Sequence, residues 1–104
     1  SLMGLFSTIN HVLQKADALL EKKGQASSAL AKALLAGEGL ETDELLANAA
    51  GELMKRQEIL DAKLTAFDAA DSPDPATLAG LAQEAAFLEK WESQIQQRRL
   101  RLID

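Results

Sequence analysis

Few side chains in this sequence have the type and spacing that chemistry requires. His11 is the single histidine, and no Glu lies three residues from it, so the Glu-x-x-His pattern of helical di-metal sites is absent. Ser27 and Ser28 have no nearby base that would activate a hydroxyl as a nucleophile. Glu92 is the one acidic residue on an apolar helical stripe, and pairing with Arg56 explains it better than metal binding. We therefore expect no enzyme, no metal and no cofactor.

The composition favours helices and disfavours several functional classes. The 104 residues contain 19 Ala and 19 Leu but only nine Val, Ile and Thr together, a balance that favours helices over strands. A net charge of −5 with dispersed acidic residues disfavours nucleic-acid binding. The chain has no Cys, and no apolar stretch approaches the ~20 residues of a membrane span. A cytoplasmic location is the default expectation.

The longest organised stretch, residues 42–103, reads as a helical hairpin. Its first arm carries a seam at alternating spacings of four and three, the heptad pattern of a helix that packs along a partner helix. These seam positions are Leu46, Ala50, Leu53, Gln57, Leu60, Leu64 and Phe67. The second arm has a matching stripe that includes Leu78, Leu81, Ala85, Leu88, Ile95 and Leu102. Folding the arms together buries both stripes.

Local signals mark the ends of the arms and the turn between them. Thr42 is expected to cap the first arm. Asp74 and Pro75 are expected to be the N-cap and the first helical residue of the second arm. The turn is predicted at residues 71–75, where proline makes continuation of the helix unfavourable.

The position of the turn also predicts a register. Pairing about it places residue i near residue 145 minus i. Arg56 then falls near Glu89 and Glu92, and the acidic start of the first arm falls near the arginines of residues 98–101. Such surface ion pairs are each worth only about 0–1 kcal/mol, so their value is that they agree with the apolar pattern.

The first 39 residues supply a third helix or two shorter ones. Residues 1–2, which precede Met3, look like a cloning remnant and are left out of the fold prediction. Residues 5–36 have a helical pattern in which Gly24 either weakens or breaks the helix, and we favour the unbroken helix. The Gly-Glu-Gly stretch at 37–39 is expected to end it. The sequence therefore predicts a single all-α domain: an antiparallel three-helix bundle, or a four-helix one, built on the long hairpin.

More apolar residues flank the two seams than a pair of helices needs. Met54 and Ile59 flank the first seam, and Phe87, Trp91 and Leu100 flank the second. One further helix covers only one side of a hairpin, and exposed apolar patches usually mark an interface. We predict that these five residues bind a helical or disordered segment of a protein partner. Without a partner, we expect a homodimer that buries Trp91 or Phe87.

The hairpin resembles a known group of proteins. The stretch at 53–61 (LMKRQEILD), the Pro-containing turn, the stretch at 78–88 and the Gln- and Arg-rich end are similar to the small helical export chaperones of the flagellar type III secretion system. The resemblance implies a non-enzymatic chaperone or adaptor that holds a terminus of a secreted protein along the hairpin. A structural oligomer subunit is an alternative that the pattern does not separate from this one.

The N-terminal segment supports a second hypothesis. Residues 3–20 are similar to the amphipathic N-terminal helix of the phage-shock and vesicle-inducing membrane-remodelling family, although the chain is too short for that family's long coiled coil. This resemblance implies a peripheral protein that binds a membrane surface through Leu5, Phe6, Ile9 and Val12. The bundle hypothesis instead buries the same residues against the hairpin.

Overall fold

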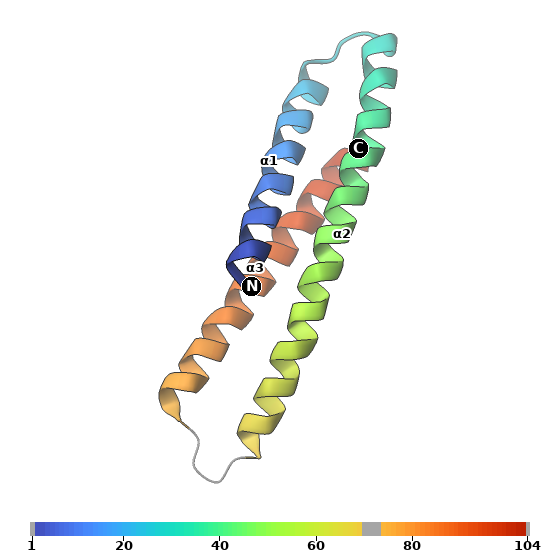
Figure 1. Cartoon of the computed structure of the whole chain (residues 1–104). Helices are drawn as coiled ribbons and strands as arrows, with labels where there is room; N and C mark the ends of the chain where they lie inside the picture. The colour runs from blue at the N-terminus through green and yellow to red at the C-terminus, as the bar shows by residue number, and fades with distance from the viewer. Residues whose placement is uncertain (1, 70–73, 104) are drawn as a thin grey trace.

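The computed structural model describes residues 2–69 and 74–103, and nearly all of them lie in three α-helices. Helix α1 spans Leu2–Gln25, α2 spans Ala29–Asp68 and α3 spans Pro75–Ile103. All three helices contact one another, so the predicted all-α three-helix bundle is confirmed. The molecule is elongated, with extents of 64 × 21 × 17 Å (Figure 1).

A serine cap separates α1 from α2. Ser28 has an extended backbone, with φ −100° and ψ 154°, and its Oγ accepts a hydrogen bond from the Ala31 backbone N–H at 3.1 Å. This bond satisfies one of the N–H groups that the first turn of a helix leaves without a backbone partner. Gly24 lies inside α1, which continues to Gln25. The unbroken helix that we favoured over residues 5–36 is therefore wrong, because the break falls at the serine.

Helix α2 runs without interruption through Gly37 and Gly39, where the sequence was expected to end a helix. No glycine in the described part of the chain has a positive φ. Thr42, predicted as a cap, is a buried residue inside this helix. The half-buried Ala31 and Leu35 extend the inward-facing seam toward Ser28. Packing along α1 therefore offsets the cost of the two glycines, about 1 kcal/mol each, and the bundle has three helices rather than four.

The start of α3 confirms the predicted cap. Asp74 Oδ1 accepts a hydrogen bond from the Ala76 backbone N–H at 3.1 Å, and the Thr77 hydroxyl donates to Asp74 Oδ2 at 2.9 Å. Pro75 is the first helical residue, a position where its missing N–H costs nothing. Residues 71–73 of the predicted turn lie outside the described residues.

The three helices overlap only in the middle of the rod. Helices α1 and α3 run in one direction and α2 runs against both (Figure 1). Helix α2 spans the whole length, whereas α1 begins about midway along it and α3 stops short of the α1–α2 connection. Each end of the molecule is therefore only two helices thick, with α1 and α2 at one end and α2 and α3 at the other.

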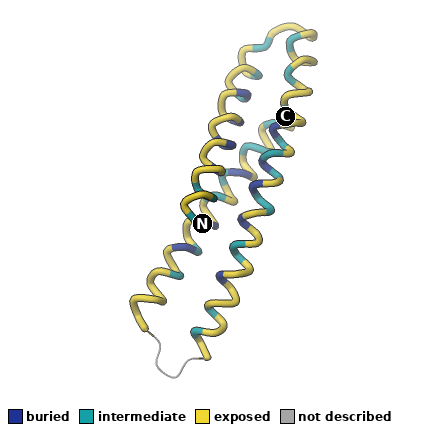
Figure 2. The backbone as a smooth tube through the Cα atoms, in the orientation of Figure 1, coloured by how far each residue is buried: buried dark blue, intermediate teal, exposed yellow. Residues whose placement is uncertain are grey.

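The core follows this overlap. Figure 2 shows buried residues on the facing sides of the helices and almost none near the two ends of the rod. The four largest fully buried side chains come from all three helices and are Ile9, Leu46, Leu60 and Ile95. The rest of the core is Val12, Leu13, Ala16, Ala49, Leu53 and Leu88. The predicted seams of the hairpin arms thus form the centre of the core.

The register between α2 and α3 differs from the predicted one by about a helical turn. Arg56 binds Glu84, which lies five residues earlier in α3 than the nearest predicted partner. Asp43 binds Arg99, as expected for the acidic start of the arm and the C-terminal arginines. Helix α2 ends at Asp68, before the turn that the sequence predicted. A residue of α2 therefore pairs with a residue closer to the start of α3 than predicted.

Leu60 provides a test of the packing between α2 and α3. Its side chain has no exposed surface, so Leu60→Ala leaves a cavity and is expected to lower the free energy of unfolding by about 2–5 kcal/mol. Leu30→Ala is the matched control, because Leu30 is 71% exposed and its truncation is expected to change stability by less than ~0.5 kcal/mol. Urea denaturation followed by circular dichroism measures both. Equal losses in the two variants would contradict the packing.

Gly37 provides a test of the continuity of α2. A Cβ atom added at this residue meets nothing within 4 Å, and Ala is about 1 kcal/mol better than Gly inside a helix. Gly37→Ala is therefore expected to raise the free energy of unfolding by about 0.5–1 kcal/mol in the same urea assay. A helix that ended here with a left-handed glycine would instead be destabilised by the substitution.

Candidate functional site

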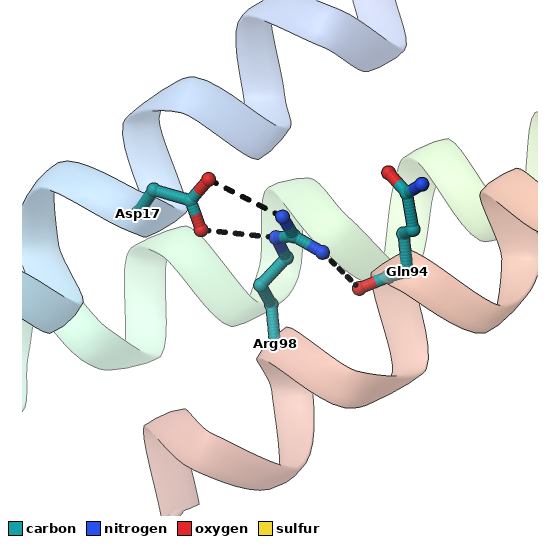
Figure 3. A network of polar contacts seen from close by, with 3 residues as sticks. All are labelled: Asp17, Gln94 and Arg98. Atoms are coloured by element: carbon teal, nitrogen blue, oxygen red, sulfur yellow. Dashed lines mark hydrogen bonds and ion pairs between the residues drawn. The ribbon is translucent and has the colours of Figure 1, made fainter.

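Two arginines near the end of α3 fix this helix against its neighbours. Arg98 Nε and Nη2 donate to the two carboxylate oxygens of Asp17 on α1, at 3.0 and 3.3 Å, and Nη1 donates to the carbonyl oxygen of Gln94 at 3.2 Å (Figure 3). Arg99 Nε donates to Asp43 Oδ1 on α2 at 2.8 Å. Two side chains of the basic run at 98–101 thus bind acidic residues of the neighbouring helices at the surface of the bundle.

One further ion pair lies between α2 and α3. Arg56 Nε donates to Glu84, whose side chain is only 9% exposed. A buried carboxylate without a partner would be strongly destabilising, so this pair helps to set which residues of the two helices meet. The predicted partners of Arg56, Glu89 and Glu92, are exposed instead. Within the described residues, every buried side-chain nitrogen and oxygen has a hydrogen-bond partner, so no such atom marks a ligand site.

Lys23 joins the end of α1 to the end of α3. Its Nζ donates to the backbone carbonyls of Arg101 and Leu102, at 3.0 and 3.2 Å. The last turn of a helix leaves carbonyls without helical partners, and the helix dipole favours a cation there. Lys23 therefore stabilises the point at which α3 ends.

Beyond this point a groove of about 550 Å³ opens between α1 and α2. It lies at the last turn of α3, whose Leu102 and Ile103 line it, toward the end of the molecule where α1 and α2 continue (Figure 1). Its apolar and small lining residues come from all three helices and include Leu19, Leu35, Ala36 and Gly39. The groove is thus the place where the three-helix packing stops before the two-helix end begins.

The groove combines an apolar floor with a cationic rim. Lys23 and Lys32 line it, and Arg101 borders an adjoining hollow that Lys23 also lines. Ala36 and Gly39 are small, so an occupant can approach the backbone of α2 closely. This arrangement suits one face of an amphipathic helix that buries its apolar side chains and turns acidic ones toward the lysines.

Large apolar side chains also remain exposed toward this end of the molecule. Those that are at least 65% exposed are Leu30, Leu34 and Leu40 of α2 and Leu100 and Ile103 of α3. Only Leu100 was predicted as an interface residue. Sequence reasoning missed the others in α2 because residues 37–39 were interpreted as a loop. The spacing of Leu35, Gly39 and Thr42 continues the predicted seam inward-facing along the helix, and it was the signal that α2 extends through this region.

The five predicted partner-binding residues do not form one patch. Met54, Ile59 and Leu100 are exposed, Phe87 is 40% exposed, and Trp91 is half-buried. Phe6 of α1 packs against the two aromatic rings of α3, with centroid distances of 5.9 Å to Phe87 and 4.7 Å to Trp91. Helix α1 therefore covers part of the predicted surface. The partner-binding role of the five residues stays a prediction.

The residues of the membrane-surface hypothesis face the bundle. Ile9 and Val12 are buried, and Leu5 and Phe6 are half-buried. Binding to a membrane through these residues would require α1 to leave the core. Within the described residues, no helix combines the length and the apolar character needed to cross a membrane. The structure thus supports the packing role of α1 over its membrane-surface role.

The described side chains do not gather into a metal-binding arrangement. His11 and Ser27 are exposed, and residues 2–69 and 74–103 contain no group of three or more His, Cys, Asp or Glu that could hold a metal ion. The expectation that the protein is not an enzyme stays a prediction.

The fold and the groove together describe a small three-helix protein with an exposed apolar interaction surface. No family model, curated protein or solved structure matches this chain. Its role is therefore argued from its own geometry.

Trp91 reports the contact between α1 and α3. It is the single Trp of the chain, and Phe6 covers one side of its ring. Phe6→Ala is expected to shift the emission maximum of Trp91 to longer wavelength, because water reaches the ring. Phe67→Ala, at the far end of α2, is the control and is expected to leave the emission unchanged. Unchanged emission in Phe6→Ala would contradict the packing of α1 on α3.

Proposed function

We propose that this protein is a non-enzymatic interaction module that holds a short amphipathic helix of a partner protein in the groove beyond α3. The observation that carries the proposal is that α1 and α2 extend past the end of α3 while apolar residues still line the space between them. In the middle of the rod the same two helices bury such residues against α3.

A helix is the occupant that this geometry favours. A partner helix laid along α1 and α2 would continue the three-helix packing past Ile103, and helix-in-groove recognition needs only anchors at i, i+3 or i+4, and i+7. The part of α2 at 29–36 spans about 12 Å at ~1.5 Å per residue. Two to three turns of partner helix are therefore sufficient.

Apolar burial supplies the affinity and the lysines supply the orientation. Covering apolar surface is worth about 25 cal/mol per Å² before the cost of association is subtracted. Exposed ion pairs with Lys23 and Lys32 add only about 0–1 kcal/mol each, but they favour an acidic flank on the partner and disfavour a basic one. The preferred partner segment is thus apolar on one face and acidic beside it.

An export chaperone or adaptor is the specific role that we favour. The resemblance of residues 53–61 and 78–88 to flagellar export chaperones supports it, since such proteins hold helical or disordered termini. A cytoplasmic location would follow from that role. A structural oligomer subunit is the second candidate, because the exposed apolar residues Met54 and Leu100 also fit contacts between copies of the chain.

Site-specific photo-crosslinking tests the groove. The full chain carrying a photoreactive benzoyl-phenylalanine in place of Ala36 is irradiated in extract of the source organism, and adducts are mapped by mass spectrometry. We expect adducts on one amphipathic segment with acidic flanking residues. The same photoreactive residue in place of Asn48, which is exposed elsewhere on α2, is the control. Equal adduct yields at both positions would contradict the proposal.

A groove-filling substitution gives the quantitative test. Nothing lies within 4 Å of a Cβ added at Gly39, so Gly39→Leu places a side chain in the groove without disturbing the core. It is expected to weaken binding of the mapped segment, measured as a fluorescent peptide by anisotropy, at least tenfold. Gly37→Leu adds the same side chain two residues away, outside the groove lining, and is expected to leave the affinity unchanged. Equal affinities in both variants would contradict binding in the groove.

A further inference from the structure

We infer that the face of α2 and α3 opposite α1 is the contact surface of an antiparallel homodimer whose two-fold axis passes close to Ala47. The inference does not rest on the proposed function, although Ile103 belongs to both surfaces because it also lines the groove. The occupant is a second copy of this chain. The face differs from the predicted one, because Phe6 covers Phe87 and Trp91 within the same molecule.

An apolar stripe runs along this face of α2. Leu40, Ala47 and Met54 repeat every seven residues, so they lie on one stripe of the helix. Asp43, which lies three residues from Leu40 and four from Ala47, binds Arg99 of α3. This contact places the stripe on the α3 side of α2. Leu40 and Met54 are 76% and 64% exposed, so the described residues leave most of their surface uncovered.

Helix α3 continues the same face. Leu100 and Ile103 are 65% and 78% exposed, and Leu100 follows directly after Arg99, the residue that binds α2. These two side chains therefore extend the apolar face from α2 onto α3.

The charges of the two halves of the rod favour an antiparallel pair. Among the described residues, those at 45–69 and 74–95 include eight Asp and Glu but four Lys and Arg. Those of the same two helices at 29–44 and 96–103 include four Asp and Glu and four Lys and Arg. A parallel pair would set the two acidic halves side by side, which costs free energy. An antiparallel pair sets each acidic half beside the neutral half of its partner.

The face is large enough for a stable dimer. The rod is 64 Å long and 21 Å wide. The projected area of one side is therefore larger than the ~800 Å² per partner that a standard interface buries. In the antiparallel pair, α2 packs on α2 and α3 on α3 of the second copy. Helices α2 and α3 then each have an antiparallel neighbour across the interface, the arrangement of many four-helix bundles.

Single cysteines test the register. The chain contains no Cys, so an introduced one reports its own contact. Ala47→Cys is expected to form a disulfide-linked dimer on mild oxidation, because the two copies of this residue meet at the two-fold axis. Asn48→Cys is the matched control, since it lies ~100° further round the helix, and it is expected to cross-link at least tenfold more slowly. Equal rates would overturn the inference.

Two further positions distinguish antiparallel from parallel pairing. A mixture of Leu40→Cys and Met54→Cys is expected to form a mixed disulfide dimer. Neither variant alone is expected to do so, because the two copies of residue 40 lie ~21 Å apart along the helix, at ~1.5 Å per residue, which is beyond the reach of a disulfide. Rapid dimers of Leu40→Cys alone would show parallel pairing and overturn the inference.

Light scattering tests the dimer itself. The wild-type chain is expected to have twice the 11.2 kDa mass of the monomer at micromolar concentration. Met54→Glu is expected to raise the dissociation constant at least tenfold while circular dichroism shows unchanged helix content. A monomer at all concentrations up to ~100 μM would overturn the dimer. If the protein is a monomer but the photoreactive residue at position 36 still gives adducts with a partner segment, the dimer alone is overturned. If the protein is a dimer and position 36 gives no adducts, the proposed function alone is overturned.

Discussion

The inward-facing seam of α2 is the constraint on which the rest of the structure depends. This helix of 40 residues has no partner helix of its own length, and a helix in a protein gains most of its stability from packing against its neighbours. Helices α1 and α3 divide the seam between them: α1 covers its first part, α3 covers its last part, and both cover the middle. The core, the polar contacts and the two-helix ends all follow from the offset between α1 and α3 along this seam.

Periodicity and local capping made much of the fold predictable. The hairpin seam through Leu46, Leu53 and Leu60 and the cap at Asp74 were read from spacing and residue type alone, since these signals are local. The break at residues 37–39 was predicted wrongly, because a glycine costs a helix only about 1 kcal/mol and packing against a neighbouring helix exceeds that cost. The cap at Ser28 was not predicted, although a serine side chain provides a hydrogen bond to the first turn of a helix that a glycine cannot.

The candidate site was less predictable than the fold, since it depends on where helices end relative to one another. The sequence shows that Phe87 and Trp91 are apolar and flank a seam, but only the fold shows that Phe6 covers them. Likewise, Leu35 and Ala36 look like ordinary helical residues. They line a groove because α1 and α2 continue past Ile103, the last described residue of α3, and no local pattern in α2 contains that information. An exposed interface was therefore predictable in kind but not in position.

The basic residues near the end of α3 have two roles: some pair with acidic residues of the neighbouring helices, and others lie at the groove. The arginines of residues 98–101 were predicted to lie near the acidic start of the first hairpin arm, and Arg99 binds Asp43 there. Arg98 instead binds Asp17 of α1. The pairing of these two arginines leaves Lys23, Lys32 and Arg101 as the cations at the groove. Lys23 closes the end of α3 through backbone carbonyls and also lines the groove. A partner helix that begins where α3 ends would place its own N-terminus, and the acidic residues that a helix N-terminus favours, beside this lysine.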